Sequence, residues 1–430
     1  MIKKESSNAP QKLPLVGSLQ VYKYKFSNGL KLLVLEDHSS PTFAYQTWYG
    51  VGSRDEVKGH TGLAHLFEHM MFKGTKNHKE GEFFKLMKAV GSEGENAFTS
   101  KDYTAYVQEL PKEHLEFIAQ LESDRMQNLI VDDAAFTTER EVVQNERRFS
   151  YENNPDGLMY QEIFGLAFTE HSYHWPTIGY EEDLSRMAAT EASQFYKNFY
   201  APNKATIIVT GDIKHDEVYN IIKKHYEKIQ TSETLNIQQA RESTQTTPRR
   251  KIVKFNIQIE KLYMGYPVPE ILHEDIPALQ VLGEILAGGK SSRLYRALVN
   301  TGVSSDLESG VLENTEPSLF LITTNLQKNK KAAFAESIIL REIQRLIQEP
   351  IAQKEHEKVQ NRMSFAFYEG LSHNSSLARF LGKYEVISGN FEEGVKLFQK
   401  SLVVNAEDIK KAAKKYLIPD HRSVIIGVMK

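Results

Sequence analysis

The two halves of this 430-residue chain carry the same local pattern, and this repeat constrains the fold more than any other feature. NFYAPNKATIIVTG at 198–211 aligns with KYLIPDHRSVIIGV at 415–428, with the prolines of the two segments 217 residues apart. Independently, HLFEH at 65–69 falls over VLGEI at 281–285, at a shift of 216. Two distant matches with nearly equal shifts indicate a tandem duplication of one unit that contains both strands and helices.

The chain length and the repeat together predict two domains. A chain of 430 residues exceeds what one hydrophobic core usually organises. We therefore predict an α+β fold of two homologous domains, each a mixed β-sheet backed by helices, which face each other across a cleft. Residues 229–248 read IQTSETLNIQQARESTQTTP, a Thr-, Gln- and Ser-rich composition that is typical of a linker. The predicted domains are 15–228 and 251–430, with the linker at 229–250.

Periodicity within the first half predicts individual elements. Alternating polar and apolar residues on both sides of Asn28-Gly29 indicate a β-hairpin at 19–36. Apolar runs predict further strands at 104–110 and 204–212. Helical periodicity predicts four helices, at 60–73, 80–90, 111–128 and 132–150.

Composition excludes several classes of protein. The 53 Lys and Arg nearly balance the 56 Asp and Glu, so we expect no nucleic-acid binding. The chain has no Cys, so any metal must be held by His, Asp or Glu. No apolar run approaches the roughly 18 residues of a membrane span, and the start MIKKESSNAPQKLP lacks the apolar stretch of a secretory signal. We expect no membrane association and a cytoplasmic location, or a periplasmic or exported one if a signal peptide has been removed.

One predicted helix carries two histidines and a glutamate in an otherwise apolar segment, HLFEHMMFKGT at 65–75. Residues four apart lie on one helix face, so His65 and His69 can bind one metal ion, and Glu68 lies beside the same position. A catalytic zinc ion has three protein ligands and one position for water, whose proton a neighbouring carboxylate can remove. The pattern H-x-x-E-H is the reverse of the more common H-E-x-x-H.

A solvated polar helix face is the alternative interpretation of this segment, and two observations disfavour it. The surrounding residues are apolar, so the helix is expected to be covered on most sides, and buried His and Glu need partners. The second copy has Val281 and Ile285 at the two histidine positions. A helix that served only packing could therefore have been apolar in the first copy as well.

A third ligand is expected from the predicted helix at 132–150, which offers Glu139, Glu141 and Glu146. Glu139 and Glu146 are seven residues apart and share a helix face, so either could reach the ion while the other orients a ligating histidine. Each could instead be a surface carboxylate paired with a neighbouring arginine. The residues alone leave this choice open.

Four segments also match segments of a known family. They are GLAHLFEHMMFKGT at 62–75, ENAFTSKDYTAYVQEL at 95–110, EREVVQNE at 139–146 and YLIPDHRSVIIGV at 416–428. Together they resemble the inverted-zincin metallopeptidases, which include pitrilysin, insulysin and the mitochondrial processing peptidase. The resemblance covers nearly the whole chain.

The resemblance implies a zinc metalloendopeptidase with one zinc ion per chain. It implies that His65, His69 and Glu146 are the zinc ligands, that Glu68 is the general base, and that Glu139 orients a ligand from outside the coordination sphere.

The same resemblance implies how a substrate binds. An extended peptide would add to an edge strand at 96–108 and contact Asn96, Ala97 and Phe98. Main-chain hydrogen bonds hold any extended segment in this way, while side-chain pockets set preference. We therefore expect peptides or unfolded segments as substrates.

One departure from the family concerns the second domain. Single-chain and homodimeric relatives carry an Arg and a Tyr there that bind the substrate carbonyl, whereas LVNTGVSSDL at 298–307 has Val299 and Ser305 near those places. We therefore expect a heterodimer with a homologous partner that lacks the zinc site and supplies both residues. A homodimer that uses Tyr103 or His174 is an alternative, as are a non-catalytic assembly subunit and a metal-dependent hydrolase of another substrate class.

Overall fold

The structure, a computed structural model, describes residues 9–233 and 239–430, which divide into two compact units. Each unit combines three chain segments, so three helices cross a boundary between units: α4 (Asp133–Arg147), α11 (Gln353–Gly370) and α13 (Glu392–Val403). Unit 1 comprises Met1–Val143, Thr177–Ile237 and Glu369–Val395, and unit 2 comprises Gln144–Pro176, Gln238–Tyr368 and Lys396–Lys430. The predicted limits 15–228, 229–250 and 251–430 follow the sequence repeat, whereas these units follow packing. Residues 234–238 of the predicted linker lie outside the described residues.

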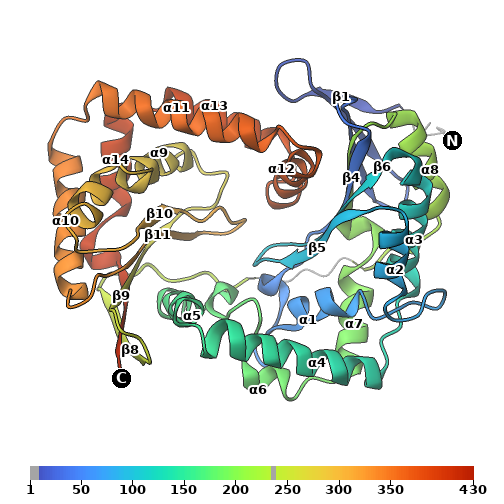
Figure 1. Ribbon diagram of the computed structural model, residues 1–430, viewed down its shortest axis with the longest axis horizontal. Helices are drawn as coiled ribbons and strands as arrows, with labels where there is room; N and C mark the ends of the chain where they lie inside the picture. The colour runs from blue at the N-terminus through green and yellow to red at the C-terminus, as the bar shows by residue number, and fades with distance from the viewer. Residues whose placement is uncertain (1–8, 234–238) are drawn as a thin grey trace. The chain divides into compact units, whose positions relative to one another are not determined.

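Unit 1 is built on a seven-stranded mixed sheet with the order β1-β2-β3-β7-β4-β6-β5 (Figure 1). Its strands are β1 (Gln11–Pro14), β2 (Gln20–Lys25), β3 (Lys31–Glu36), β4 (Thr42–Tyr49), β5 (Glu93–Thr99), β6 (Thr104–Pro111) and β7 (Ala205–Gly211). Only β3 and β7 pair in parallel, and β5 forms one edge. The predicted hairpin at 19–36 is confirmed, with Gly29 at a φ of 86° in its turn.

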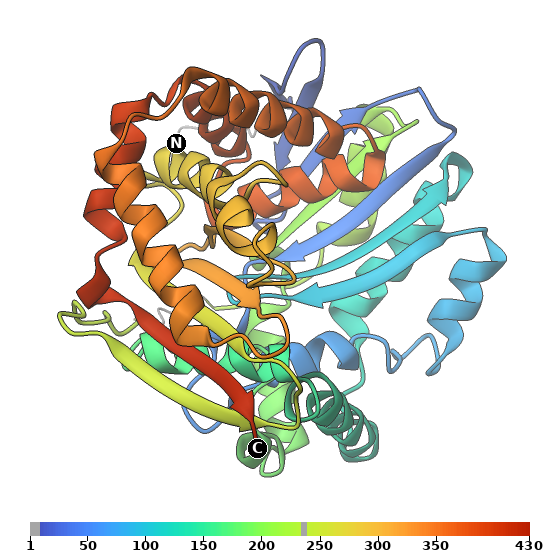
Figure 2. The same cartoon turned by 60° about the vertical axis from the view of Figure 1, so that its left-hand side comes forward.

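Unit 2 is built on a five-stranded sheet with the order β10-β11-β9-β12-β8, and the strands of both sheets are visible in Figure 2. Its strands are β8 (Arg249–Phe255), β9 (Lys261–Val268), β10 (Glu308–Val311), β11 (Ser318–Asn325) and β12 (Ser423–Met429). Here only β8 and β12 pair in parallel. The order β8-β12-β9-β11-β10 therefore repeats β3-β7-β4-β6-β5 of unit 1, pair by pair. The predicted α+β class is confirmed.

Helices cover both faces of the unit 1 sheet. They are α1 (Leu63–Met70), α2 (Glu82–Ala89), α3 (Leu115–Asn128), α4 (Asp133–Arg147), α6 (Glu181–Leu184), α7 (Ala189–Phe199), α8 (His215–Tyr226) and α12 (Asn374–Ile387). Along β4, Tyr45 bonds to Tyr226 of α8 on one face, while Gln46 donates to the Ser375 carbonyl of α12 on the other. Because both faces are covered, nearly every residue of β4 is buried, Trp48 included.

The helices of unit 2 are α5 (Pro155–Ala167), α9 (Ile276–Ala287), α10 (Ala332–Gln348), α11 (Gln353–Gly370), α13 (Glu392–Val403) and α14 (Ala406–Tyr416). Helix α5 packs on β8, β9 and β12, where Met159 and Ile163 are fully buried in an apolar cluster. Thus α5, from the first half of the sequence, completes unit 2, just as α12, from the second half, completes unit 1.

Two predicted elements differ from the structure. The edge strand expected at 96–108 is wrong as a single strand, because a tight turn divides it into β5 and β6 and only β5 lies at the edge. In that turn, the Ser100 hydroxyl accepts the backbone N–H groups of Asp102 and Tyr103. The α-helix expected at 132–150 ends at Arg147, and a π-helical turn, Arg148–Glu152, follows it directly.

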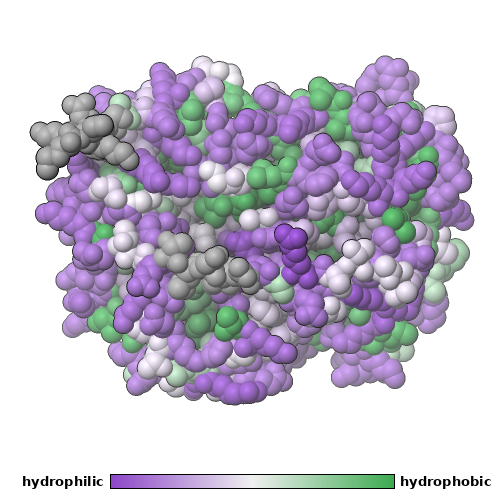
Figure 3. Space-filling model, turned by 180° about the vertical axis from the view of Figure 1, so that it is seen from behind, coloured by the Kyte–Doolittle hydropathy of each residue, from purple (hydrophilic) through white to green (hydrophobic). Residues whose placement is uncertain are grey.

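The surface seen in Figure 3 is mostly hydrophilic, with hydrophobic side chains in limited patches. Within the described residues, no helix has both the length and the apolar character needed to cross a membrane.

Gly382 of α12 tests the packing of this helix on the unit 1 sheet. A β-carbon at Gly382 would overlap the buried Trp48 indole, so Gly382→Ala should destabilise the protein by about 1–3 kcal/mol, as overpacked cores do. Replacing a helical glycine by alanine normally stabilises, by about 0.5–1 kcal/mol. Gly370→Ala, at the end of α11 with no atom within 4 Å of the new carbon, is the control in urea unfolding. Equal stability of the two variants would contradict the packing described.

Candidate metal centre

Helix α1 is held at its first turn by glycines and by one buried carboxylate. Gly62 precedes the helix with a φ of 92°, a conformation that favours glycine. Glu56, which is 5% exposed, accepts the N–H groups of Gly62 and Ala64 at 2.9 and 2.8 Å. These bonds satisfy two of the amides that an α-helix leaves open at its N-terminus. Leu66, Phe67 and Met70 are fully buried, and their packing holds α1 against the core.

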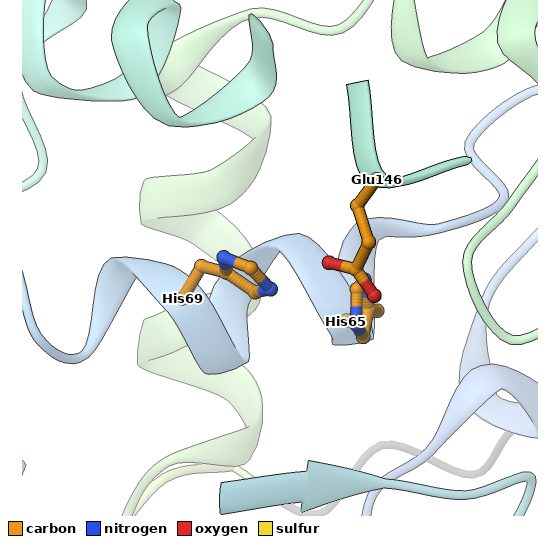
Figure 4. A group of neighbouring side chains, drawn as sticks. All are labelled: His65, His69 and Glu146. Atoms are coloured by element: carbon orange, nitrogen blue, oxygen red, sulfur yellow. The ribbon is translucent and has the colours of Figure 1, made fainter. Parts of the chain in front are cut away.

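The two histidines of α1 lie on its partly exposed side and meet a carboxylate from α4. The ring centroids of His65 and His69 are 4.9 Å apart. Ligand atoms of His65, His69 and Glu146 all lie within 4.8 Å of one another, the one such group of three among the described residues. Figure 4 shows the Glu146 carboxylate directed toward the two imidazoles.

Glu146 reaches this position through a continuous helix. Although the unit boundary falls after Val143, α4 runs unbroken from Asp133 to Arg147 and also carries Glu139. Two helical turns separate Glu139 from Glu146, so the contact that Glu139 makes with α1 also directs Glu146 toward it. In the structure, Glu146 is grouped with the two histidines, and Glu139 lies behind His69.

Glu139 fixes the orientation of His69. The His69 Nδ1 lies 2.9 Å from Glu139 Oε1, and Lys73 Nζ lies 3.1 Å from Oε2. Burial raises the pKa of Glu139, but the hydrogen bonds from His69 and Lys73 outweigh it, so the pKa is lowered below its ordinary value. An ionised carboxylate can only accept, so the proton of this hydrogen bond is on Nδ1 of His69, and this is the tautomer in which Nε2 could bind a metal.

The donor set fits zinc. Two imidazole nitrogens and one carboxylate oxygen form a ligand set typical of catalytic zinc, and thiolates are absent from the chain. A carboxylate behind a ligating histidine, as Glu139 lies behind His69, is the usual support of such sites. His65, His69 and Glu146 could therefore hold one zinc ion.

Glu68 lies on α1 between the two histidines and is 9% exposed. The hydroxyl of Thr99, the last residue of β5, donates to Glu68 Oε2 at 2.6 Å. The phenols of Tyr106 and Tyr200 lie nearby, and burial raises the pKa of both, with smaller contributions that include Glu68 itself. The Thr99 hydroxyl thus holds one oxygen of a carboxylate that has buried tyrosines nearby.

A cavity of about 550 Å³ adjoins Glu68 and the outer edge of the sheet. It is lined by Glu68, His69, Phe72, Lys73, Glu80, Gly81, Phe84, Glu95, Asn96, Ala97 and Glu139. Asn96 and Ala97 of β5 therefore share a cavity with the expected base, and the Asn96 side chain accepts the Ala97 N–H at 2.9 Å. The strand edge and the candidate metal helix form two walls of one site.

Phe98, the third residue predicted to contact substrate, lies outside this lining. Side chains alternate along a strand, and the Phe98 ring packs with Trp48 at 5.5 Å, with Tyr103 at 6.1 Å and under the Arg379 guanidinium at 4.4 Å. A substrate contact by Phe98 stays a prediction and would involve its backbone.

Three residues that support the site were missed in the sequence, namely Glu56, Lys73 and Thr99. Lys73 and Thr99 contact residues distant in sequence, Glu56 accepts amides across a loop, and periodicity carries no signal for such contacts. The one sequence signal for a role of Thr99 in the site is its position in the predicted edge strand, shortly after Asn96 and Ala97.

In the second copy, apolar residues stand at the positions of the two histidines, while Glu284, at the position of Glu68, is paired with Arg362. Val281 and Ile285 of α9 are both fully buried, so this helix serves packing. Val299 ends a π-helical turn, and the Ser305 hydroxyl is bonded to Asp306 and to the Asn325 carbonyl.

The support of His69 by Glu139 can be tested through metal affinity. In Glu139→Gln the charge that holds Nδ1 is lost, so zinc affinity should fall about 10- to 100-fold, as measured by competition with a chelator. Glu141→Gln, at an exposed position of the same helix, is the matched control and should keep the wild-type affinity. An unchanged affinity in Glu139→Gln would refute the supporting role.

Comparison with known proteins finds related sequences over most of the chain. Residues 31–178 match the family described as Insulinase (Peptidase family M16), and residues 186–363 match the Peptidase M16 inactive domain. Zinc protease PqqE of Helicobacter pylori is 30% identical over 90% of this chain and 88% of that protein.

Solved structures extend this likeness to the fold. A protease from Helicobacter pylori superposes with a TM-score of 0.91 and 28% identity, covering 97% of this chain and 100% of that one. The peptidase M16 inactive domain from Pseudomonas fluorescens has a TM-score of 0.84 at 16% identity, over 95% and 98% of the two chains, a likeness of fold. The resemblance to the inverted-zincin metallopeptidases is thereby confirmed, and the chain belongs to peptidase family M16, the insulinase family.

Proposed function

We propose that the chain is a zinc-dependent endopeptidase that cleaves extended peptides or unfolded segments. The observation that carries the proposal is the convergence of His65, His69 and Glu146 beside Glu68, at a cavity bordered by a strand edge. Relatives named zinc proteases support it.

Each residue of the site would have a separate role in hydrolysis. His65, His69 and Glu146 would hold the zinc ion, which when bound supplies a Lewis acid and lowers the pKa of a water molecule. Glu68 takes the proton of the attacking water and delivers it to the leaving amine of the substrate. Glu139 keeps the His69 ring in one tautomer throughout.

Strand β5 would bind the substrate as an added strand. It is the last strand of its sheet among the described residues, and Asn96 and Ala97 place its edge in the same cavity as Glu68. Main-chain hydrogen bonding favours an extended peptide of any sequence. To bond there, a substrate would displace the Asn96 amide oxygen from the Ala97 N–H.

We further propose that the active form is a heterodimer, in which a homologous partner without a zinc site supplies an Arg and a Tyr for the substrate carbonyl. Val299 has no polar side-chain group, and the Ser305 hydroxyl is engaged within unit 2. The tetrahedral intermediate would therefore need donors from elsewhere. In the homodimer alternative, Tyr103 or His174 would serve, although Tyr103 packs on Trp48 and His174 Nδ1 lies 2.6 Å from the Phe168 carbonyl.

A non-catalytic assembly subunit is the second candidate. The match of residues 186–363 to the inactive domain favours it for the second half alone. Glu68, His65, His69 and Glu146 all lie outside that range, and a scaffold has no need for such a group.

Metal content and hydrolysis together test the proposed activity. The wild type should carry about one equivalent of zinc by mass spectrometry, and His69→Ala should carry little. Glu68→Gln should keep its zinc while peptide hydrolysis falls about 10²- to 10⁴-fold, because only the base is lost. A zinc-loaded wild type that hydrolyses no peptide, alone or with native partners, would instead support the assembly subunit.

Purification from the native source tests the heterodimer. The single chain should hydrolyse peptides at least about 100-fold more slowly than the chain with its co-purified homologue, because transition-state donors are absent. A single chain as fast as the complex would exclude the proposed partner. A digest of a peptide library by the active form would then give the cleavage preference.

A further inference from the structure

We propose that Thr99 is a positioning residue for Glu68, which joins the orientation of the general base to the strand that accepts the substrate. The inference rests on the function proposed above. Its basis is a hydrogen bond of 2.6 Å between two elements, from the Thr99 hydroxyl at the end of β5 to Glu68 Oε2 on α1. Hydrogen bonds to an ionised carboxylate are short and about twice as strong as neutral ones.

The hydroxyl of the cross-strand neighbour bonds to another acceptor, which leaves the Thr99 proton for Glu68. Thr99 pairs with Thr104 across the β5–β6 hairpin, and the two hydroxyl oxygens lie 3.3 Å apart. Thr104, which is fully buried, also donates to the Val51 carbonyl at 3.0 Å. A carbonyl and a carboxylate only accept, so the single proton of Thr104 goes to the Val51 carbonyl and the single proton of Thr99 goes to Glu68.

The backbone of Thr99 is equally well fixed. The neighbouring ring of Phe98 is clamped on the opposite face of the strand by Trp48 and Arg379. Since side chains alternate along a strand, Thr99 and Ala97 lie on the same side of β5. Ala97 lines the cavity with Glu68, so the residue that borders the substrate and the residue that holds the base are two positions apart.

The consequence is that one strand, β5, would both bind the substrate and hold the general base. A carboxylate held at Oε2 has one preferred plane, and the loss of even about 1 Å of alignment at a reacting group slows catalysis strongly. A peptide that adds to β5 would therefore lie along the same strand that holds the base through Thr99. The alternative is that Thr99 only satisfies a buried carboxylate, in which case its hydroxyl affects stability and not turnover.

Substitutions at Thr99 separate these roles. Thr99→Val keeps the shape of the side chain and its strand preference but removes the hydroxyl, and kcat should fall about 10- to 100-fold, as expected for one bond to a charged group. KM, zinc content and melting temperature should stay near those of the wild type. Thr99→Ser restores the donor and should recover most of kcat.

Thr42→Val is the matched control, because the Thr42 hydroxyl donates to Glu109 Oε1 at 2.8 Å at the far end of the same sheet. It should leave kcat unchanged. The measurements use the full chain, together with its partner where one is required for activity.

Three results would overturn the inference. They are a wild-type kcat in Thr99→Val, an equal loss in Thr99→Ser, and an equal loss in Thr42→Val. Glu68→Gln, measured in parallel, keeps the two proposals distinguishable. If Glu68→Gln retains activity, the function proposed for Glu68 fails. If Glu68→Gln is inactive while Thr99→Val is unimpaired, only the positioning role fails.

Discussion

The site depends on one hydrogen bond, from His69 on α1 to Glu139 on α4. It joins two helices that are 70 residues apart in sequence, fixes the tautomer of one candidate ligand, and brings the helix that carries the other candidate ligand, Glu146, against α1. Each end is anchored independently. Glu56 holds the first turn of α1, and Lys73 neutralises the second oxygen of Glu139. A pre-formed arrangement of this kind needs little reorganisation when a metal binds.

The sequence predicted those parts of the site that lie within one helix. His65, Glu68 and His69 follow from the spacing of one turn, and the apolar residues around them correctly indicated a buried helix. The choice between Glu139 and Glu146 could not follow from spacing, since both lie on one face of α4 and only the crossing of two helices decides which is nearer. The bond of Thr99 to Glu68 was beyond prediction for the same reason, because it joins a strand end to a helix.

The fold was predictable to a similar degree. The repeat at a shift of 216 to 217 residues correctly indicated two similar units, since five strands of each sheet follow the same order. The division of 96–108 into two strands was missed because the edge strand was taken from the resemblance, although residues 99–102 read TSKD and are polar. In this turn the Ser100 side chain replaces strand hydrogen bonding. The exchange of α5 and α12 left no local signal, since an amphipathic helix does not specify which sheet it covers.

The place of α12 has a consequence for how the protein is made. The sheet that carries β5, and against which α1 lies, is encoded almost entirely before residue 212, yet the helix that covers Gln46 and Trp48 ends at Ile387. Domains usually fold as they emerge from the ribosome. This one has to keep an apolar sheet face uncovered until most of the chain has been translated, and α5 has to wait in turn for strands made long after it. The folding of unit 1 is therefore completed only after α12 has been translated.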